Sequence, residues 1–266
     1  MKSDFHCHTK WCDGRAGVEE MALAAIEKGF CKLGFSSHSM LPSDMLDWAL
    51  TVAKAPRYAA DVREVAESYK NKIEISLGVE ADFLPGVATC DRKVYSDISP
   101  DYIIGSVHFV ASPTGANVIV DMSPENLKEG VEQNYDGDFS LFVKDYFRQE
   151  RLMVETCDFD IIGHADLVRK FNSNSIFFDE SDAWYKGELE ATADAIATSN
   201  KIVEVNTGAI YRGYLQDAYP SAFFRSLLRA RGVSFILSSD AHCPQAIGYA
   251  FNQFEDQETY LGHFRR

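Results

Sequence analysis

The sequence predicts an α/β fold, a barrel of seven β/α units. Seven short runs of β-branched and apolar residues alternate with longer amphipathic stretches, which is the pattern of a parallel sheet wrapped by helices. Runs such as 102–109 and 202–206 are apolar enough for burial on both faces. The chain has 266 residues. Since single α/β barrels often have about 250 residues, we predict one domain over residues 1–266.

The expected elements follow one another along the chain in a regular order. Strands are expected at residues 3–8, 32–38, 73–80, 102–109, 160–165, 202–206 and 234–239. Helices are expected at residues 18–28, 58–70, 141–156, 182–199 and 221–231. Residues 112–138 form the longest irregular stretch, rich in Gly, Pro, Asn and Asp, and we expect an excursion over one end of the barrel. Long loops of this kind often carry specificity.

The composition excludes several classes of protein. With 46% hydrophobic and 12% aromatic residues, the chain can bury a sizeable core, which excludes disorder. The formal net charge of −14 argues against a nucleic-acid polymer or a membrane surface as partner. Bound metal cations would supply the positive charge that an anionic substrate needs. Without an apolar leader or a long apolar run, a cytoplasmic location with reduced cysteines is expected.

The histidines are the most informative residues. Six of the seven lie at or just past the C-terminal end of a predicted strand: His6, His8, His38, His108, His164 and His242. In β/α barrels the active site lies at this end, because the loops after the strands converge there. One such histidine alone would usually be a hydrogen-bonded core residue, but six in register favour a shared site. The seventh, His263, lacks this context and is expected at the surface.

Two pairs with i, i+2 spacing indicate metal binding. Because side chains alternate along a strand, His6 and His8 face one side and Cys7 faces the other. Asp240 and His242 repeat this spacing at the last strand. Both pairs could face the centre of the barrel and chelate an ion.

Two further carboxylates bring the candidate ligands to nine. Asp13 lies in the loop after the first strand, and Glu80 lies at the end of the third. Alternatively, Asp13 is a turn residue, Glu80 a solvated strand end and Asp240 a helix cap. Nine ligands are too many for one ion, since zinc usually takes four, so two or three ions are expected.

These motifs resemble those of the PHP (polymerase and histidinol phosphatase) family of metal-dependent phosphoesterases, and most closely its histidinol-phosphate phosphatases. The resemblance extends from about residue 3 to about residue 248. It is carried by DFHCHTKWCDG, FSSHS, LGVEADF, IGSVHF, IIGHADLVRKF, VEVNTGAI and SSDAH. It implies a distorted, TIM-like barrel of seven parallel strands with a centre of three divalent ions.

The resemblance also implies how the ligands are shared. The first ion would be held by His6, His8, Glu80 and Asp240, the second by Glu80 as a bridge with His108 and His164, and the third by Asp13, His38 and His242. Some relatives have a histidine where this chain has Asp13. A hard oxygen ligand favours manganese, iron or magnesium over zinc at that position. The expected cofactors are therefore three divalent ions: zinc, manganese or iron, with magnesium as an alternative.

The implied activity is hydrolysis of a small phosphate monoester, most directly L-histidinol phosphate of histidine biosynthesis, by a metal-activated hydroxide. Arg169 and Arg212 lie just beyond strand ends and are candidates for binding the phosphate; the alternative is that they are ordinary exposed arginines. Asp13 or His242 could protonate the leaving alkoxide. Because a ligating group is a poor acid, a metal-bound water is the alternative.

Three other interpretations stay open. The chain could act on another phosphate ester, such as a nucleotide or a sugar phosphate, or it could be a non-catalytic PHP module. It could also be an amidohydrolase barrel, which uses a similar pair of histidines and a late aspartate. That class generally needs a bridging carboxylated lysine, whose place Glu80 takes here. The oligomeric state is not predicted.

Overall fold

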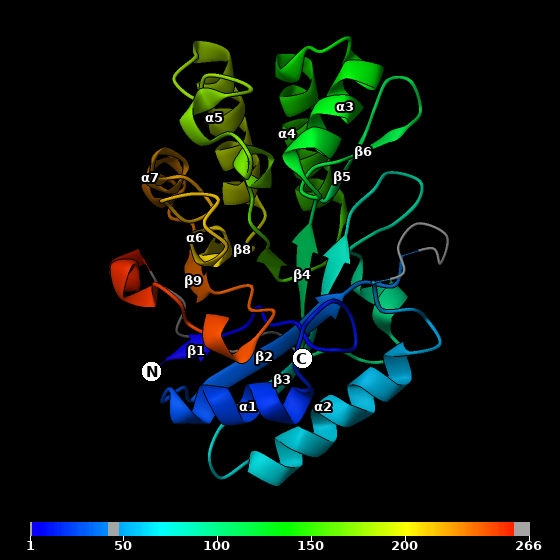
Figure 1. Ribbon diagram of the computed structural model, residues 1–266, viewed down its shortest axis with the longest axis vertical. Coiled ribbons are helices and arrows are strands. Elements are labelled where there is room, and N and C mark those ends of the chain that lie inside the picture. The colour runs from blue at the N-terminus through cyan, green and yellow to red at the C-terminus, as the bar shows by residue number, and fades with distance from the viewer. Residues whose placement is uncertain (1, 42–47, 258–266) are drawn as a thin grey trace.

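A central sheet of parallel strands organises the computed structural model (Figure 1). The structure describes residues 2–41 and 48–257, so the expectation for His263 lies outside the described residues. In sheet order the strands are β1 (Ser3–Asp4), β2 (Lys32–His38), β3 (Glu74–Asp82), β4 (Tyr102–Ser106), β7 (Ile161–Ile162), β8 (Ile202–Asn206) and β9 (Phe235–Ser238). A parallel bridge between Cys7 and Ala241 joins the two ends of the sheet. The predicted seven-stranded barrel is thus confirmed.

Helices surround the sheet (Figure 1). Helices α1 (Val18–Glu27) and α2 (Ala55–Tyr69) lie at the bottom of the view, while α4 (Phe139–Thr156), α5 (Ala183–Thr198) and α7 (Ala222–Ala230) cover the opposite side. A short helix, α6 (Gly208–Tyr211), follows β8. Asp138 and Ser221 accept hydrogen bonds from backbone N–H groups at the start of α4 and α7, which fixes where these helices begin. No helix in the described ranges is both long and apolar enough to cross a membrane.

The expectation that residues 112–138 are irregular is wrong, although the segment does lie over one end of the barrel. Strand β6 (Asn117–Ile119) pairs with β5 (Phe109–Ala111) in an antiparallel hairpin, and α3 (Pro124–Tyr135) follows. Ser123 caps α3 by accepting a hydrogen bond from the backbone N–H of Asn126. Pro124 occupies the first turn, where a missing N–H costs nothing. Ser123 and Pro124 are therefore helix-start signals here, not loop signals.

Tyr102 fills the interior of the barrel. Its side chain is fully buried, and its hydroxyl donates a hydrogen bond to the carbonyl oxygen of Phe5 at 2.6 Å. Gly34 and Gly78 face it from β2 and β3. A Cβ at either glycine would lie 2.3 Å from an atom of the tyrosine, so no larger residue fits. This plug, completed by the buried side chains of Ile104, Ile161 and Ile236, forms the floor beneath the carboxyl ends of the strands.

Candidate metal centre

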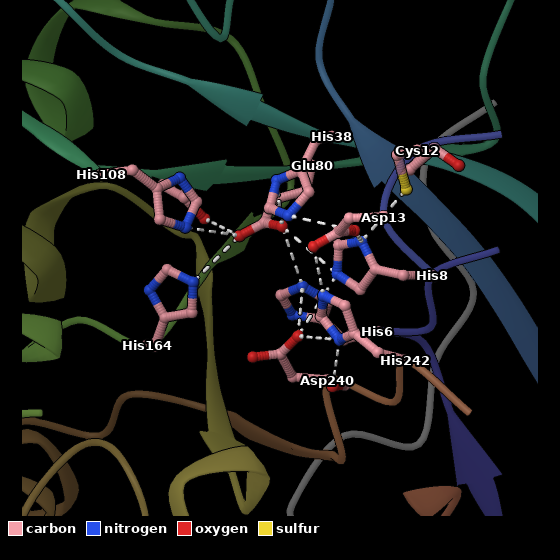
Figure 2. A network of polar contacts seen from close by, with 12 residues as sticks. His6, His8, Cys12, Asp13, His38, Glu80, His108, His164, Asp240 and His242 are labelled. Atoms are coloured by element: carbon pink, nitrogen blue, oxygen red, sulfur yellow. Dashed lines mark hydrogen bonds and ion pairs between the residues drawn. The ribbon is translucent and has the colours of Figure 1, made fainter. Parts of the chain in front are cut away.

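All nine predicted ligands converge at the carboxyl ends of the strands, around Glu80 (Figure 2). Along β3 the side chains alternate, so Glu80 faces the interior, as Gly78 does. His38 is the neighbour of Glu80 across the β2–β3 ladder. The others follow strand ends: His6, His8, Asp13, His108, His164, Asp240 and His242.

The Glu80 carboxylate lies between two groups of imidazoles. Its Oε1 is 2.9 Å from Nε2 of His164 and 3.4 Å from Nε2 of His108. These two rings lie on one side of Glu80 in Figure 2. Its Oε2 faces three ring nitrogens at 3.1, 3.2 and 3.4 Å, those of His38, His6 and His8. A carboxylate with a separate set of ligands at each oxygen has the geometry to bridge two cations.

A further set of ligand atoms surrounds Asp13. Its Oδ2 is 3.0 Å from Nε2 of His242, and its Oδ1 is 3.7 Å from Nε2 of His38. Asp240 reaches the cluster from the other side, with Oδ1 3.3 Å from Nε2 of His8. Asp240 has a φ of 50°, in the left-handed region that non-glycine residues seldom occupy. Such strained backbone tends to be retained at functional sites.

Several ligand atoms have no other way to satisfy their polarity. Nε2 of His6, Nε2 of His8, Nδ1 of His38 and Oε2 of Glu80 are buried and have no hydrogen-bond partner among the described residues. Buried polar atoms in folded proteins are nearly always paired. Here all four converge on one place, and imidazole nitrogen with carboxylate oxygen is a suitable donor set for zinc and similar divalent ions. The residues present therefore fit a metal centre.

The charges in the cluster are strongly coupled. Burial, together with the neighbouring His242 and His38, lowers the pKa of His8 to about 3, so this ring is neutral, as a metal ligand must be. Burial disfavours the ionised form of Glu80, but the surrounding imidazoles outweigh it and hold the pKa of that carboxyl well below its usual value. Burial also disfavours the ionised form of Asp240. Arg212 and His6 outweigh this effect and hold the pKa of Asp240 well below its usual value. The carboxylates are thus available as anionic ligands.

Two buried carboxylates outside the predicted set orient the ligands. Oδ1 of Asp82 lies 2.7 Å from Nδ1 of His108, and Oε2 of Glu204 lies 2.8 Å from Nδ1 of His6. Although burial opposes it, Asp82 with Glu80 raises the pKa of His108 to about 10. Neither Asp82 nor Glu204 was among the predicted site residues. The signal that could have found Glu204 is its acidic side chain in the middle of an otherwise apolar strand.

A cavity of about 270 Å³ opens onto the cluster. Besides metal-ligand candidates, its wall includes Trp48, Phe109, Ile119, Asp121, Met122, Leu167, Lys170, Arg212 and Tyr219. The β5–β6 hairpin and the residues after it thus form part of the wall. A larger cavity of about 660 Å³ lies against Lys28, Phe30 and Leu237, but none of the candidate ligands lines it.

The structure brings only one of the two predicted arginines into the cavity wall. Arg212 lines it, with Nη1 3.1 Å from Oδ2 of Asp240 and Nη2 2.9 Å from Nδ1 of His242. Arg169 is buried outside the lining, where its Nε donates to Glu180 at 3.1 Å and its Nη1 has no partner. The adjacent Lys170 lines the cavity instead and donates to Asp121 at 3.1 Å.

The chain belongs to the PHP family: the sequence model of the PHP domain matches residues 4–208. Two relatives that match nearly the full length of the chain are named as histidinol-phosphatases, a narrower group than the family. It is 31% identical to the "Probable histidinol-phosphatase" of Deinococcus radiodurans over 93% of this chain and 89% of that protein. It is 23% identical to the histidinol-phosphatase of Bacillus subtilis over 96% of this chain and 98% of that one.

Solved structures share the fold. A candidate histidinol phosphatase of Listeria monocytogenes has a TM-score of 0.85 and 23% identity, covering 95% of this chain and 100% of that one. The histidinol phosphate phosphatase of Lactococcus lactis was solved in complex with zinc, L-histidinol and phosphate. It has a TM-score of 0.64 and 19% identity over 99% of this chain and 96% of that one. The predicted PHP barrel is thus confirmed.

Proposed function

We propose that this protein is a metal-dependent phosphomonoesterase that hydrolyses L-histidinol phosphate to L-histidinol and phosphate. The observation that carries the proposal is the convergence of four unpartnered, buried ligand atoms, on His6, His8, His38 and Glu80, at the end of a PHP barrel. The substrate follows from relatives that are named as histidinol-phosphatases and that match nearly the full length of the chain.

Three overlapping sets of the predicted ligands support three divalent ions; a fourth group, His38, Asp82 and His108, shares its histidines with them. Glu80 with His108 and His164 forms one set, and Glu80 with His6 and His8 forms another, which Asp240 approaches. The third set lies around Asp13 and consists of His8, Asp13, His38 and His242. We keep zinc, manganese and iron as the expected metals, with magnesium as an alternative, because the sets mix nitrogen and carboxylate ligands.

Divalent cations supply Lewis acidity toward phosphoryl oxygens and lower the pKa of water to near neutrality. The chain itself supplies the rest of the site. Arg212, held against Asp240, is positioned to bind the phosphate of the ester, and Lys170 adds a second positive charge at the wall. Arg169 stays a candidate, because its Nη1 is free of hydrogen-bond partners. Trp48 and Phe109 give the wall an apolar part.

The proton for the leaving alkoxide has three predicted sources: Asp13, His242 and a metal-bound water. Despite burial, the neighbouring imidazoles lower the pKa of Asp13, so this carboxyl is ionised and has no proton to give. Asp13 and Asp240 outweigh burial and raise the pKa of His242. Because His242 is also a candidate metal ligand, and a ligating group is a poor acid, the alternative of a metal-bound water stays open.

Phosphate release from L-histidinol phosphate tests the proposal directly. Metal-reconstituted protein is compared with a chelator-treated sample across a panel of nucleotide and sugar phosphates. Selective turnover of L-histidinol phosphate that the chelator abolishes is expected. Faster cleavage of another ester would overturn the substrate, and full metal content without turnover of any ester would leave a non-catalytic module. A single domain, a cytoplasmic location and the absence of nucleic-acid or membrane partners stay predictions from the sequence.

A further inference from the structure

Glu204 contacts candidate ligands of two different ions. Its side chain lies fully buried in the barrel, on β8. Oε2 lies 2.8 Å from Nδ1 of His6, and Oε1 accepts a hydrogen bond from the backbone N–H of His164 at 2.8 Å. Oε1 also accepts from the side-chain amide of Asn206 at 2.7 Å. Glu204 thus ties the segment after β1 to the segment after β7, beneath the cluster.

The two donors at Oε1 cannot reverse their roles. A backbone N–H can only donate, so His164 always requires an acceptor at this position. The amide of Asn206 is oriented by its own oxygen, which accepts from the backbone N–H of Gly208 at 2.8 Å and leaves its nitrogen facing Glu204. The Oε1 position must therefore hold an oxygen. His6 differs, because a neutral imidazole can carry its proton on either nitrogen.

We propose that Glu204 is a positioning residue that holds the proton of His6 on Nδ1 and so keeps Nε2 free to bind a metal ion. Nε2 of His6 points into the cluster, 3.2 Å from Oε2 of Glu80, and no described residue gives it a hydrogen bond. A carboxylate behind a ligating histidine fixes the ring and its tautomer and makes it a stronger ligand. The inference rests on the proposed function only in requiring a bound cation; it does not depend on the substrate.

The substitution Glu204→Gln tests the tautomer specifically. Glutamine has nearly the same shape but offers one oxygen and one NH₂ group. Because His164 and Asn206 require the oxygen on their side, the NH₂ group must face His6. His6 can then accept this bond only by moving its proton to Nε2, where the proton blocks metal binding. The fold keeps its buried hydrogen bonds, while one ligand is lost.

Asp82 offers a matched comparison. It pairs with His108 through Oδ1, but its Oδ2 has no hydrogen-bond partner in the described part of the chain. In Asp82→Asn the amide oxygen is thus free to stay on His108, and the tautomer of that ring is unchanged. Glu150→Gln serves as the control for burial, because Glu150 is fully buried but bonds to Tyr146 and to none of the candidate ligands.

The experiment measures zinc stoichiometry and zinc affinity by competition with a chromophoric chelator, with thermal unfolding of each metal-free variant as a check of folding. We expect Glu204→Gln to lower the affinity for one zinc ion by about 10- to 100-fold, which is the usual effect of losing a carboxylate behind a ligating histidine. Asp82→Asn should lower zinc affinity by a smaller factor. The zinc affinity of Glu150→Gln should stay within about twofold of the wild-type value. Wild-type zinc binding in Glu204→Gln, or equal losses in Glu204→Gln and Asp82→Asn, would overturn the inference alone. A wild-type protein that binds no zinc or other divalent ion would overturn the proposed function and this inference with it.

Discussion

Replacing Glu80 with glutamine should remove more than one interaction at a time. The carboxylate is almost completely buried, and each of its oxygens faces different imidazoles: Oε1 faces His108 and His164, and Oε2 faces His6, His8 and His38. Glutamine keeps the shape but turns one oxygen into a hydrogen-bond donor. Whichever way the amide lies, one set of metal ligands loses its carboxylate oxygen and faces an NH₂ group.

The expected result is the loss of at least one bound ion and a large loss of turnover. A metal ion acting as a Lewis acid contributes several kcal/mol to the stabilisation of the transition state. A loss of about 4 kcal/mol corresponds to a rate about 10³-fold lower, at about 1.36 kcal/mol per factor of ten. Metal content is measured by elemental analysis of dialysed protein, and turnover by phosphate release from L-histidinol phosphate.

Glu74 gives the matched control, because it begins the same strand at the far end from the cluster. It is half-exposed and pairs with Lys32, so Glu74→Gln should keep full metal content and turnover. If Glu80→Gln also kept its full complement of ions and cleaved the ester at a rate close to the wild-type rate, Glu80 would not bridge metal ions, and the reasoning from its two faces would be refuted.

Three further perturbations test the phosphate site, the metal centre and the barrel plug. Arg212→Ala should raise KM for the ester by about 10- to 100-fold, which corresponds to the loss of a charged hydrogen bond. Arg231→Ala, which removes an ion pair with the exposed Asp194, should leave KM unchanged. Equal KM values in the two variants would remove Arg212 from the site. Chelation should lower Tm by several degrees, and re-addition of metal should restore it. The reason is that a cation at 100 times its Kd stabilises the fold by about 2.7 kcal/mol. An unchanged Tm would argue against bound metal. Gly78→Ala should destabilise the fold by about 1–3 kcal/mol in denaturant unfolding, because the added Cβ would overlap Tyr102. Tyr102→Phe should destabilise it by about 1 kcal/mol, because the hydrogen bond of the hydroxyl to Phe5 is lost. Wild-type stability in both variants would contradict the packing of the plug.

The sequence was sufficient to predict the barrel and the ligand cluster because both depend on simple periodicities. The alternation of side chains places His6 and His8 on one face, and the shared direction of parallel strands brings their ends together. The same alternation points Glu204 into the barrel, two residues before Asn206. Its role could not be predicted, because only the three-dimensional structure shows that it lies behind His6.

The contacts between irregular segments could not be predicted from the sequence. Arg169 and Lys170 are adjacent, at the end of the 3₁₀ turn Leu167–Arg169, yet only Lys170 lines the cavity. In so tight a turn, one residue more or less changes the direction of a side chain by about a third of a rotation. The β5–β6 hairpin was missed for another reason: its three-residue strands are too short to show a periodic pattern.

The plug beneath the cluster has a consequence for the order of events in a catalytic cycle. Among the described residues, Tyr102 and its apolar neighbours pack below the ligands and close the axis of the barrel. The cavity beside Arg212 opens onto the cluster, so we expect substrate to arrive and both products to depart by this mouth. An alcohol bound nearer the mouth must leave before the phosphate below it can escape. Inorganic phosphate should therefore be the last product released, and it should compete with the incoming ester as an inhibitor.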